Sequence, residues 1–87
     1  MDDKSTLGFR QKLDQQYNWP ALYMFKFIVP RGKEQEIKKL FPKNDILEKL
    51  SSKGNYSSLT IQMMLNSSEG VIRIYTEAGQ VEGVIAL

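Results

Sequence analysis

The sequence predicts a single α+β domain in which strands and helices follow one another in the order β-α-β-β-α-β. Apolar and polar residues alternate in four segments, which is the period of a β-strand, and apolar residues recur every three to four positions in two others, which is the period of an α-helix. The chain has 87 residues, and this length fits one domain with a modest core.

Residues 1–18 are mostly polar, and their apolar residues are widely spaced. We expect this segment to form an arm that is partly disordered, with at most a short helical turn between Leu7 and Gln16. Residues 19–87 then make up the domain. Pro20 favours an extended conformation for Trp19, so we expect Trp19 to mark the entry to the first strand and to pin the arm to the domain.

The segment ALYMFKFIVP, residues 21–30, predicts the first strand because aromatic and β-branched residues recur at every second position. Both of its faces are largely apolar, which is typical of a central strand. We expect one face to point into the core, and this face carries Tyr23, Phe25, Phe27 and Val29.

The segment KEQEIKKLFP, residues 33–42, predicts a short amphipathic helix, since Ile37, Leu40 and Phe41 share one side. Residues 45–50, DILEKL, predict a strand whose charges are typical of a sheet edge. The polar stretch SSKGNYSS follows at 51–58, where glycine and asparagine favour a tight turn.

The second half of the sequence repeats the pattern. LTIQMML, residues 59–65, predicts a half-buried strand, and NSSEGVIRIYTEAG, residues 66–79, predicts a helix that Asn66 caps and a left-handed Gly79 ends. VEGVIAL, residues 81–87, predicts the last strand, with Val84 and Ala86 on one face.

Right-handed crossovers restrict this element order to the split β-α-β arrangement, the ferredoxin-like two-layer sandwich. Four antiparallel strands in the spatial order 4-1-3-2 then carry two helices on one face. The strands at 21–30 and 59–65 become central, in agreement with their apolar composition.

Three pieces of the sequence together resemble the YbeD-like family of small bacterial domains of unknown function. They are Trp19-Pro20 before a strand with Tyr23, Phe25 and Lys26, the stretch SSKGNY, and the strand, helix and short strand that follow it. The resemblance covers residues 19–87. It implies a ferredoxin-like fold, similar in outline to ACT regulatory domains, and a cytosolic bacterial setting, but no activity. The segment between Lys26 and SSKGNY is shorter here than in the family.

The composition excludes several classes of function. The chain has neither cysteine nor histidine, and therefore lacks thiolate metal ligands and the commonest general base. Its net charge of +2 is too small to argue for nucleic acid or an anionic membrane surface. No apolar run approaches the roughly 20 residues of a membrane helix. We expect no metal, no cofactor and a cytoplasmic location.

Two activities that occur on this fold are weighed and ranked low. RNA-recognition modules stack bases on aromatic residues of the central strands, and residues 58–65 contain none. Arg31 and Asn55 are reminiscent of the arginine and asparagine of acylphosphatases, but no phosphate-binding glycine motif and no nucleophile–base pair accompanies them. We therefore expect no catalysis.

The turn after the first strand and the hairpin at 51–55 lie at the same end of this topology, which we call the polar pole. Backbone N–H groups, a helix N-terminus and three cations there predict weak binding of phosphate, a nucleotide or a carboxylate. The candidate ligand-binding residues are Arg31, Gly32, Lys33, Lys53, Gly54 and Asn55.

The sheet face opposite the helices, which we call the open face, is the second candidate surface. An uncovered face of mixed apolar character usually meets a partner. Its occupant is left open between the N-terminal arm with Tyr17 and Trp19, a second copy of the chain, and another protein. The residues expected to point outward are Met24, Lys26, Ile28, Thr60, Gln62, Met64, Val84 and Ala86.

The function expected from the sequence is that of a small non-catalytic regulatory or interaction module that binds a small anionic ligand at the polar pole. The alternative is a protein–protein adaptor or homodimer that acts through the open face.

Overall fold

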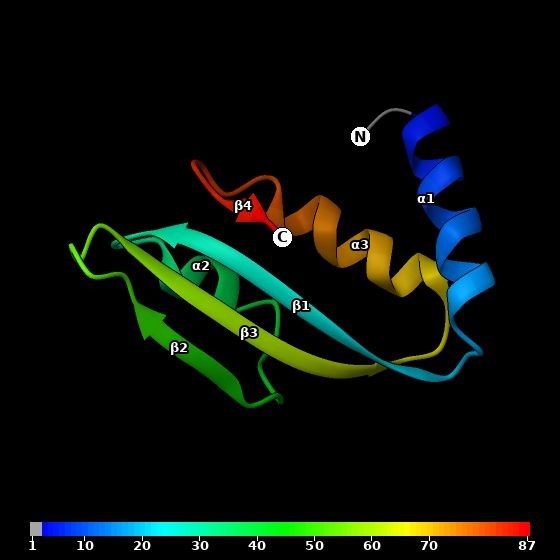
Figure 1. Cartoon of the computed structure of the whole chain (residues 1–87), viewed down its shortest axis with the longest axis horizontal. Helices are drawn as coiled ribbons and strands as arrows, with labels where there is room; N and C mark the ends of the chain where they lie inside the picture. The colour runs from blue at the N-terminus through cyan, green and yellow to red at the C-terminus, as the bar shows by residue number, and fades with distance from the viewer. Residues whose placement is uncertain (1–2) are drawn as a thin grey trace.

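An antiparallel sheet forms one layer of the molecule, and helices cover one of its faces (Figure 1). The computed structural model describes residues 3–87, with side chains from residue 7 onward. The central strands are β1 (Ala21–Pro30) and β3 (Tyr56–Leu65), and the edge strands are β2 (Ile46–Leu50) and β4 (Ile85–Ala86). The order β2-β3-β1-β4 confirms the predicted order 4-1-3-2 and, with it, the ferredoxin-like sandwich.

Helices α2 (Glu34–Lys38) and α3 (Ser68–Ala78) lie on the side of the sheet that carries the aromatic residues of β1. Helix α3 follows Ser67 as its N-cap residue, not Asn66. The left-handed Gly79 expected at its end is also wrong, because Gly79 has a φ of −65°. The helical turn continues here: the N–H of Gly79 donates to the carbonyl of Tyr75 at 2.9 Å.

The core lies between β1, β3 and the helices. Phe25, Phe27 and Val29, at alternate positions of β1, have no solvent-exposed surface (0%), as their spacing predicts. Around the Phe25 ring, the centroids of four other aromatic rings lie at distances of 4.8 to 6.1 Å. These rings belong to Tyr23, Phe27, Phe41 and Tyr75. The packed aromatic side of β1 leaves the other side of the strand to form the open face.

The N-terminal segment forms a helix, α1 (Asp3–Gln16), that lies beside α3 (Figure 1). It is longer than the short turn we expected, because Phe9 and Leu13 stand one helical turn apart and complete an apolar stripe. Leu13 is buried, and the Phe9 ring lies 5.7 Å from that of Tyr75. The segment therefore packs on the helix side of the sheet, and the alternative that it covers the open face is wrong. Residues 1–2 of the expected arm lie outside the described residues.

Trp19 connects this helix to the sheet. Its indole Nε1 donates to the Asp14 carboxylate at 2.9 Å, and its ring stacks on Tyr17 with 5.5 Å between centroids. Both Trp19 and Tyr17 pack against the core cluster.

The last strand is shorter than expected, and its two faces are reversed. β4 comprises Ile85–Ala86, which pair with Ile28 and Phe27 of β1, so Ala86 points to the helix side and Ile85 to the open face. Val84 packs against the core, and its assignment to the open face is wrong. The cause is a turn ahead of the strand: Gly83 has a φ of +80°, and a Cβ there would lie 2.7 Å from the Pro30 ring. The strand therefore cannot begin at Val81.

Candidate functional site

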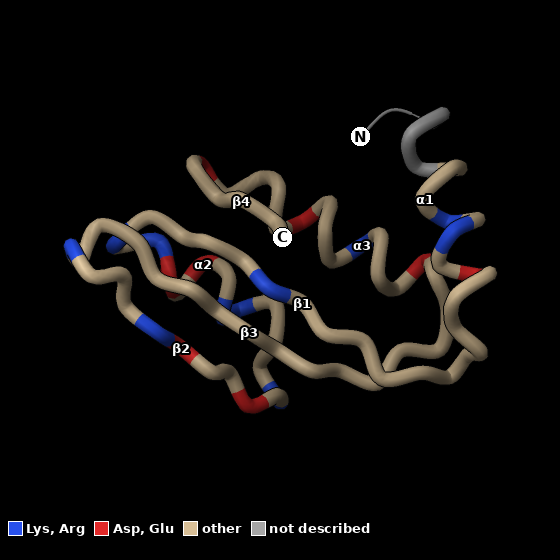
Figure 2. Tube along the Cα trace, viewed as in Figure 1, with Lys and Arg blue, Asp and Glu red and all other residues tan. Residues whose placement is uncertain are grey.

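The structure brings the two loops of the polar pole together. The backbone N–H of Arg31 donates to the carbonyl of Asn55 at 2.9 Å, which joins the turn after β1 to the β2–β3 hairpin. The guanidinium of Arg31 lies beside Gly54: an ideal Cβ on this glycine would stand 3.9 Å from Nη1. Gly32 and Gly54 have φ values of +94° and +74°, so both turns depend on glycine. Figure 2 shows basic residues gathered at this end of the sheet.

Carboxylates of the chain itself already use several of the donors at the polar pole. Glu34 accepts the N–H of Gly32 at 2.6 Å and the hydroxyl of Ser57 at 3.0 Å. Its own backbone N–H and these two donors hold the pKa of Glu34 below its usual value. Lys33 pairs with Glu36 at 3.4 Å. Glu34 fills the position in which an external anion would meet the N–H of Gly32. The geometry therefore favours a structural role for this turn over an anion-binding role.

Arg31 and Lys53 are the two cations of this pole for which the described residues contain no ion pair. The helix that follows is a single turn of five residues, which is too short to add a substantial dipole. Anion binding at the polar pole thus rests on two exposed side chains and remains a prediction.

The open face is a continuous surface across the four strands of the sheet, and the strand register fixes which residues lie side by side on it. In the register of β1 and β3, Leu22 lies opposite Met64, Met24 opposite Gln62, and Lys26 opposite Thr60. The next rows place Ile28 beside Ile85 of β4 and Thr60 beside Leu47 of β2. Residues directly opposite each other point to the same side of a sheet, so all of these side chains share the open face.

Large apolar side chains on the open face are more than half exposed. The exposed fractions are 54% for Leu22, 57% for Met24, 71% for Leu47, 61% for Met64 and 54% for Ile85. Of the residues predicted for this face, all those on β1 and β3 lie on it, namely Met24, Lys26, Ile28, Thr60, Gln62 and Met64. Leu22, Leu47 and Ile85 were not predicted. Extending the alternation of β1 by one step would have found Leu22.

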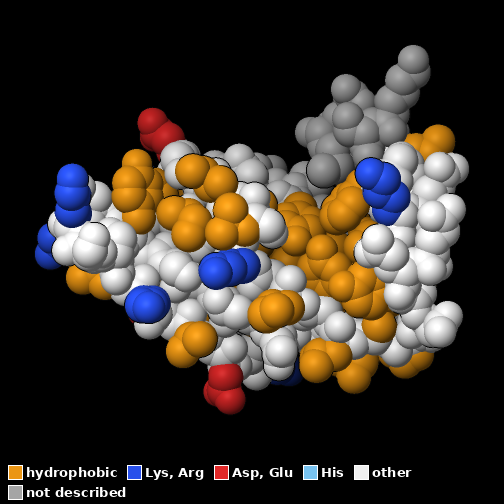
Figure 3. Space-filling model, in the orientation of Figure 1, with side chains coloured by type: hydrophobic (Ala, Val, Ile, Leu, Met, Phe, Trp, Pro, Cys, Tyr) orange, Lys and Arg blue, Asp and Glu red, His pale blue; other side chains and the backbone are white. Residues whose placement is uncertain are grey.

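Basic side chains outnumber acidic ones on the open face, where Lys43 and Asp45 lie at the edge beside Met24. Lys26 and Lys49 point outward, and the carboxylate of β2, Glu48, lies on the other side, where it pairs with Lys38 at 2.7 Å. Lys26 is the one basic residue of β1. Apolar and basic side chains alternate over the strands in the space-filling view (Figure 3). A shallow hollow of about 630 Å³ opens beside Met24, between β3 and the loop that leads into β2.

Among the described residues, no three acidic, histidine or cysteine side chains lie close enough to hold a metal ion. Within the same residues, no helix is both long and apolar enough to cross a membrane.

The fold and its two candidate surfaces define a small ferredoxin-like sandwich with an exposed, basic and apolar sheet face. The chain belongs to the family described as "Protein of unknown function (DUF493)", whose model matches residues 14–87. This confirms the resemblance to the YbeD-like family of unknown function.

The curated relatives match part of the chain. A UPF0250 protein of Shewanella sediminis is 50% identical over 36 residues, which are 41% of this chain and 41% of that protein. A UPF0250 protein of Shewanella halifaxensis is 42% identical over 38 residues, which are 44% of this chain and 43% of that protein. The matches therefore span less than half of the length of these relatives. No solved structure matches the chain.

Proposed function

We propose that the protein is a non-catalytic interaction module whose open face docks onto a partner protein with an acidic and apolar surface. The observation that carries the proposal is the exposure of Met24, Leu47 and Met64 around Lys26 on a sheet face that no described segment covers. Exposed apolar side chains that form one surface are typical of interaction sites. A cytoplasmic bacterial setting is part of the proposal.

The N-terminal segment and a second copy of the chain, the two other candidates for covering the open face, fit it less well. Helix α1 contacts α3 on the opposite side of the sheet, so the N-terminal segment is already engaged elsewhere. In a symmetric dimer through the centre of this face, Lys26 of each copy would meet its own counterpart in an apolar surrounding. Like charges that are both removed from water oppose such a dimer, whereas a partner with carboxylates would pair them.

The remaining functions considered for the fold lack support on this face. The aromatic residues of β1 are turned to the core, and Tyr56 at the start of β3, which is 44% exposed, is the one aromatic residue among the outward side chains of the central strands, so bases have a single ring on which to stack. At the polar pole, Arg31 lies close to Asn55, and we still expect weak anion binding there. That binding would be separate from the interaction proposed here.

The test is quantitative capture of partner proteins from a bacterial lysate on immobilised protein. We expect the wild-type protein to capture a defined partner. The double substitution Leu47→Ser, Met64→Ser should reduce the captured amount at least about tenfold, since hot-spot side chains contribute more than about 1 kcal/mol each to binding. Lys26→Glu should weaken capture of an acidic partner further. Leu7→Ser on α1 is the matched control, because Leu7 is also 57% exposed but lies on the helix side.

Equal capture by all variants would contradict the assignment to the open face. Sedimentation velocity over a range of concentrations checks the alternative of self-association. We expect a monomer throughout, and a dimer that the Leu47→Ser, Met64→Ser protein cannot form would assign the face to a second copy instead.

A further inference from the structure

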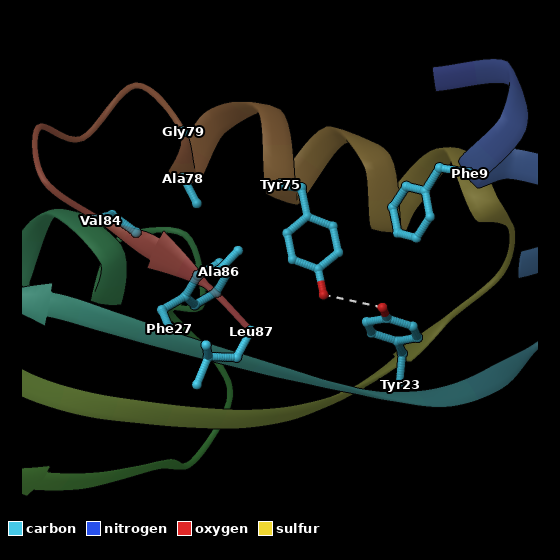
Figure 4. Close-up of a pocket in the computed structure, with 9 residues that line it drawn as sticks. All are labelled: Phe9, Tyr23, Phe27, Tyr75, Ala78, Gly79, Val84, Ala86 and Leu87. Atoms are coloured by element: carbon cyan, nitrogen blue, oxygen red, sulfur yellow. Dashed lines mark hydrogen bonds between the residues drawn. The ribbon is translucent and has the colours of Figure 1, made fainter. Parts of the chain in front are cut away.

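An apolar cleft opens on the helix side of the sheet, between α1, α3, β1 and the short strand β4. Its volume is about 470 Å³, within the range of roughly 300–1,000 Å³ that is usual for small-molecule sites. Figure 4 shows Phe9 of α1, Tyr23 of β1 and Tyr75 of α3 around this space. The cleft is separate from the open face, which lies on the other side of the sheet.

Small residues leave this space unfilled. Ala78 and Gly79 follow Tyr75 by one helical turn at the end of α3, and all three residues line the cleft. From the opposite wall, Ala86 is the residue of β4 that points to the helix side. Because none of Ala78, Gly79 and Ala86 has a side chain longer than a methyl group, the cleft stays open to solvent.

The aromatic walls of the cleft favour a flat ring as its occupant. The rings of Phe9 and Tyr23 lie 5.7 and 6.3 Å from that of Tyr75, measured between centroids, with interplanar angles of 56° and 86°. All three side chains are only partly buried, so part of each ring is accessible from the cleft. Aromatic rings pack favourably at such distances in offset or edge-to-face arrangements, and a further ring extends the cluster in the same way.

Two hydroxyl groups supply the polar contact of the cleft. The hydroxyl oxygens of Tyr23 and Tyr75 lie 3.1 Å apart, and one donates a hydrogen bond to the other. This bond uses one of the two hydroxyl protons, and the second has no acceptor among the groups that the structure describes. Burial, together with the hydrogen bond to Tyr23, raises the pKa of Tyr75, so its hydroxyl stays protonated at neutral pH. The cleft therefore offers a hydrogen-bond donor.

The lining of the cleft also disfavours a charged occupant. None of the described residues that line it has a charged side chain. An ion that leaves water for an apolar site loses hydration, and this loss is costly unless a charged partner or several hydrogen bonds replace the water. The surroundings thus favour an uncharged molecule.

We propose that the cleft binds an uncharged aromatic small molecule that carries one hydrogen-bond acceptor, such as a carbonyl group. The ring of the ligand packs against Phe9, Tyr23 and Tyr75, and its acceptor receives the free proton of the tyrosine pair. This site is independent of the protein interaction proposed for the open face, because it lies on the other side of the sheet.

The experiment titrates 1-indanone, a two-ring ketone, into the ¹⁵N-labelled full chain and follows the amide signals by NMR. We expect shift changes centred on residues 75–79 and 84–87, with a dissociation constant of about millimolar or lower, in keeping with the size of the probe. Indane-2-carboxylate and 2-aminoindane have a closely similar ring system with a negative and a positive charge. Both should bind at least about tenfold more weakly than the ketone.

Removal of the two hydroxyls tests the hydrogen bond to the ligand. The double substitution Tyr23→Phe, Tyr75→Phe should weaken 1-indanone about three- to tenfold, which is the usual contribution of one hydrogen bond. Indane, which has the ring system without the carbonyl, is the matched control ligand and should bind this variant at least as tightly as wild type. Equal weakening of 1-indanone and indane would overturn the assignment of an acceptor, because it would show a change in the shape of the cleft instead.

Two further variants test the position of the site. Ala86→Leu fills part of the cleft from an exposed position and should weaken 1-indanone at least about tenfold. Ile85→Ala changes the neighbouring residue of β4, which points to the open face, and should leave binding unchanged. The Leu47→Ser, Met64→Ser protein should also bind 1-indanone like wild type, so the two proposals can fail separately.

Three results would overturn the proposal of this site. They are the absence of shifts at the solubility limit of 1-indanone, binding of either charged analogue as tight as that of the ketone, and equal binding of 1-indanone by wild type and the Ala86→Leu protein.

Discussion

Two neighbouring residues of β1 should respond to truncation in opposite ways. Phe25 has no exposed surface and lies within 6.1 Å of four other aromatic rings, measured between ring centroids. Phe25→Ala leaves a cavity, and such changes cost about 3–5 kcal/mol. Met24, the preceding residue, is 57% exposed on the open face. Met24→Ala should cost less than about 1 kcal/mol, since it removes no buried contact and changes strand propensity slightly.

The magnitude for Phe25→Ala is large relative to the stability of the whole chain. At roughly 0.05–0.15 kcal/mol per residue, a domain of this size is stable by about 4–13 kcal/mol. In urea, with a slope of roughly 1–3 kcal/mol per molar, the midpoint of Phe25→Ala should fall by at least about 1 M or the protein should not fold. Fluorescence of Trp19 follows the transition. If Met24→Ala lost as much stability as Phe25→Ala, the assignment of the two faces of β1 would be refuted.

Three further predictions concern the turns and the polar pole. Gly83→Ala should lower the free energy of unfolding by about 1–3 kcal/mol, because it puts a side chain at a φ of +80° and against a proline ring. Gly8→Ala on α1, with nothing within 4 Å of the new methyl group, should be neutral or stabilising in the same urea assay. Because the pKa of Glu34 is lowered from its ordinary value of 4.5, its ionised form stabilises the fold above pH 4.5, and this stability is lost as the pH falls through the lowered pKa. In the Glu34→Gln protein, the urea midpoint should therefore fall less between neutral and acid pH than in wild type. A phosphate titration should shift the amides of residues 31–33 and 53–55 weakly, and unchanged amides there would remove the anion site.

The strands were predictable because the pattern of period two is long and unambiguous in β1 and β3. The faces of β1 follow directly from the alternation of Phe25 and Phe27 with Met24 and Lys26. The prediction of the faces of the last strand was wrong for a local reason. The turn before it shifts the phase of the alternation by one residue, and a one-residue shift moves every side chain to the other face. Composition alone did not indicate where that turn ends.

The candidate surfaces were predictable to different degrees. Topology placed Arg31 beside the 51–55 hairpin, as the structure has it. The contact that changes the chemistry of the polar pole, Glu34 with Gly32, depends on a side-chain rotamer and left no signal in the sequence. The short pairing between β4 and β1, at Phe27 and Ile28, could not be foreseen from the sequence either.

The central claim is that the open face is accessible to a partner, and methionine methyl NMR with a soluble paramagnetic agent tests it most directly. Met24 and Met64 lie on the open face and are 57% and 61% exposed, while Met63 points to the helix side and packs against the core. The account predicts strong broadening of the Met24 and Met64 methyl signals and a protected Met63 at every protein concentration. Protection of Met24 and Met64 equal to that of Met63 would contradict it, since the face would then be covered by the chain itself or by a second copy.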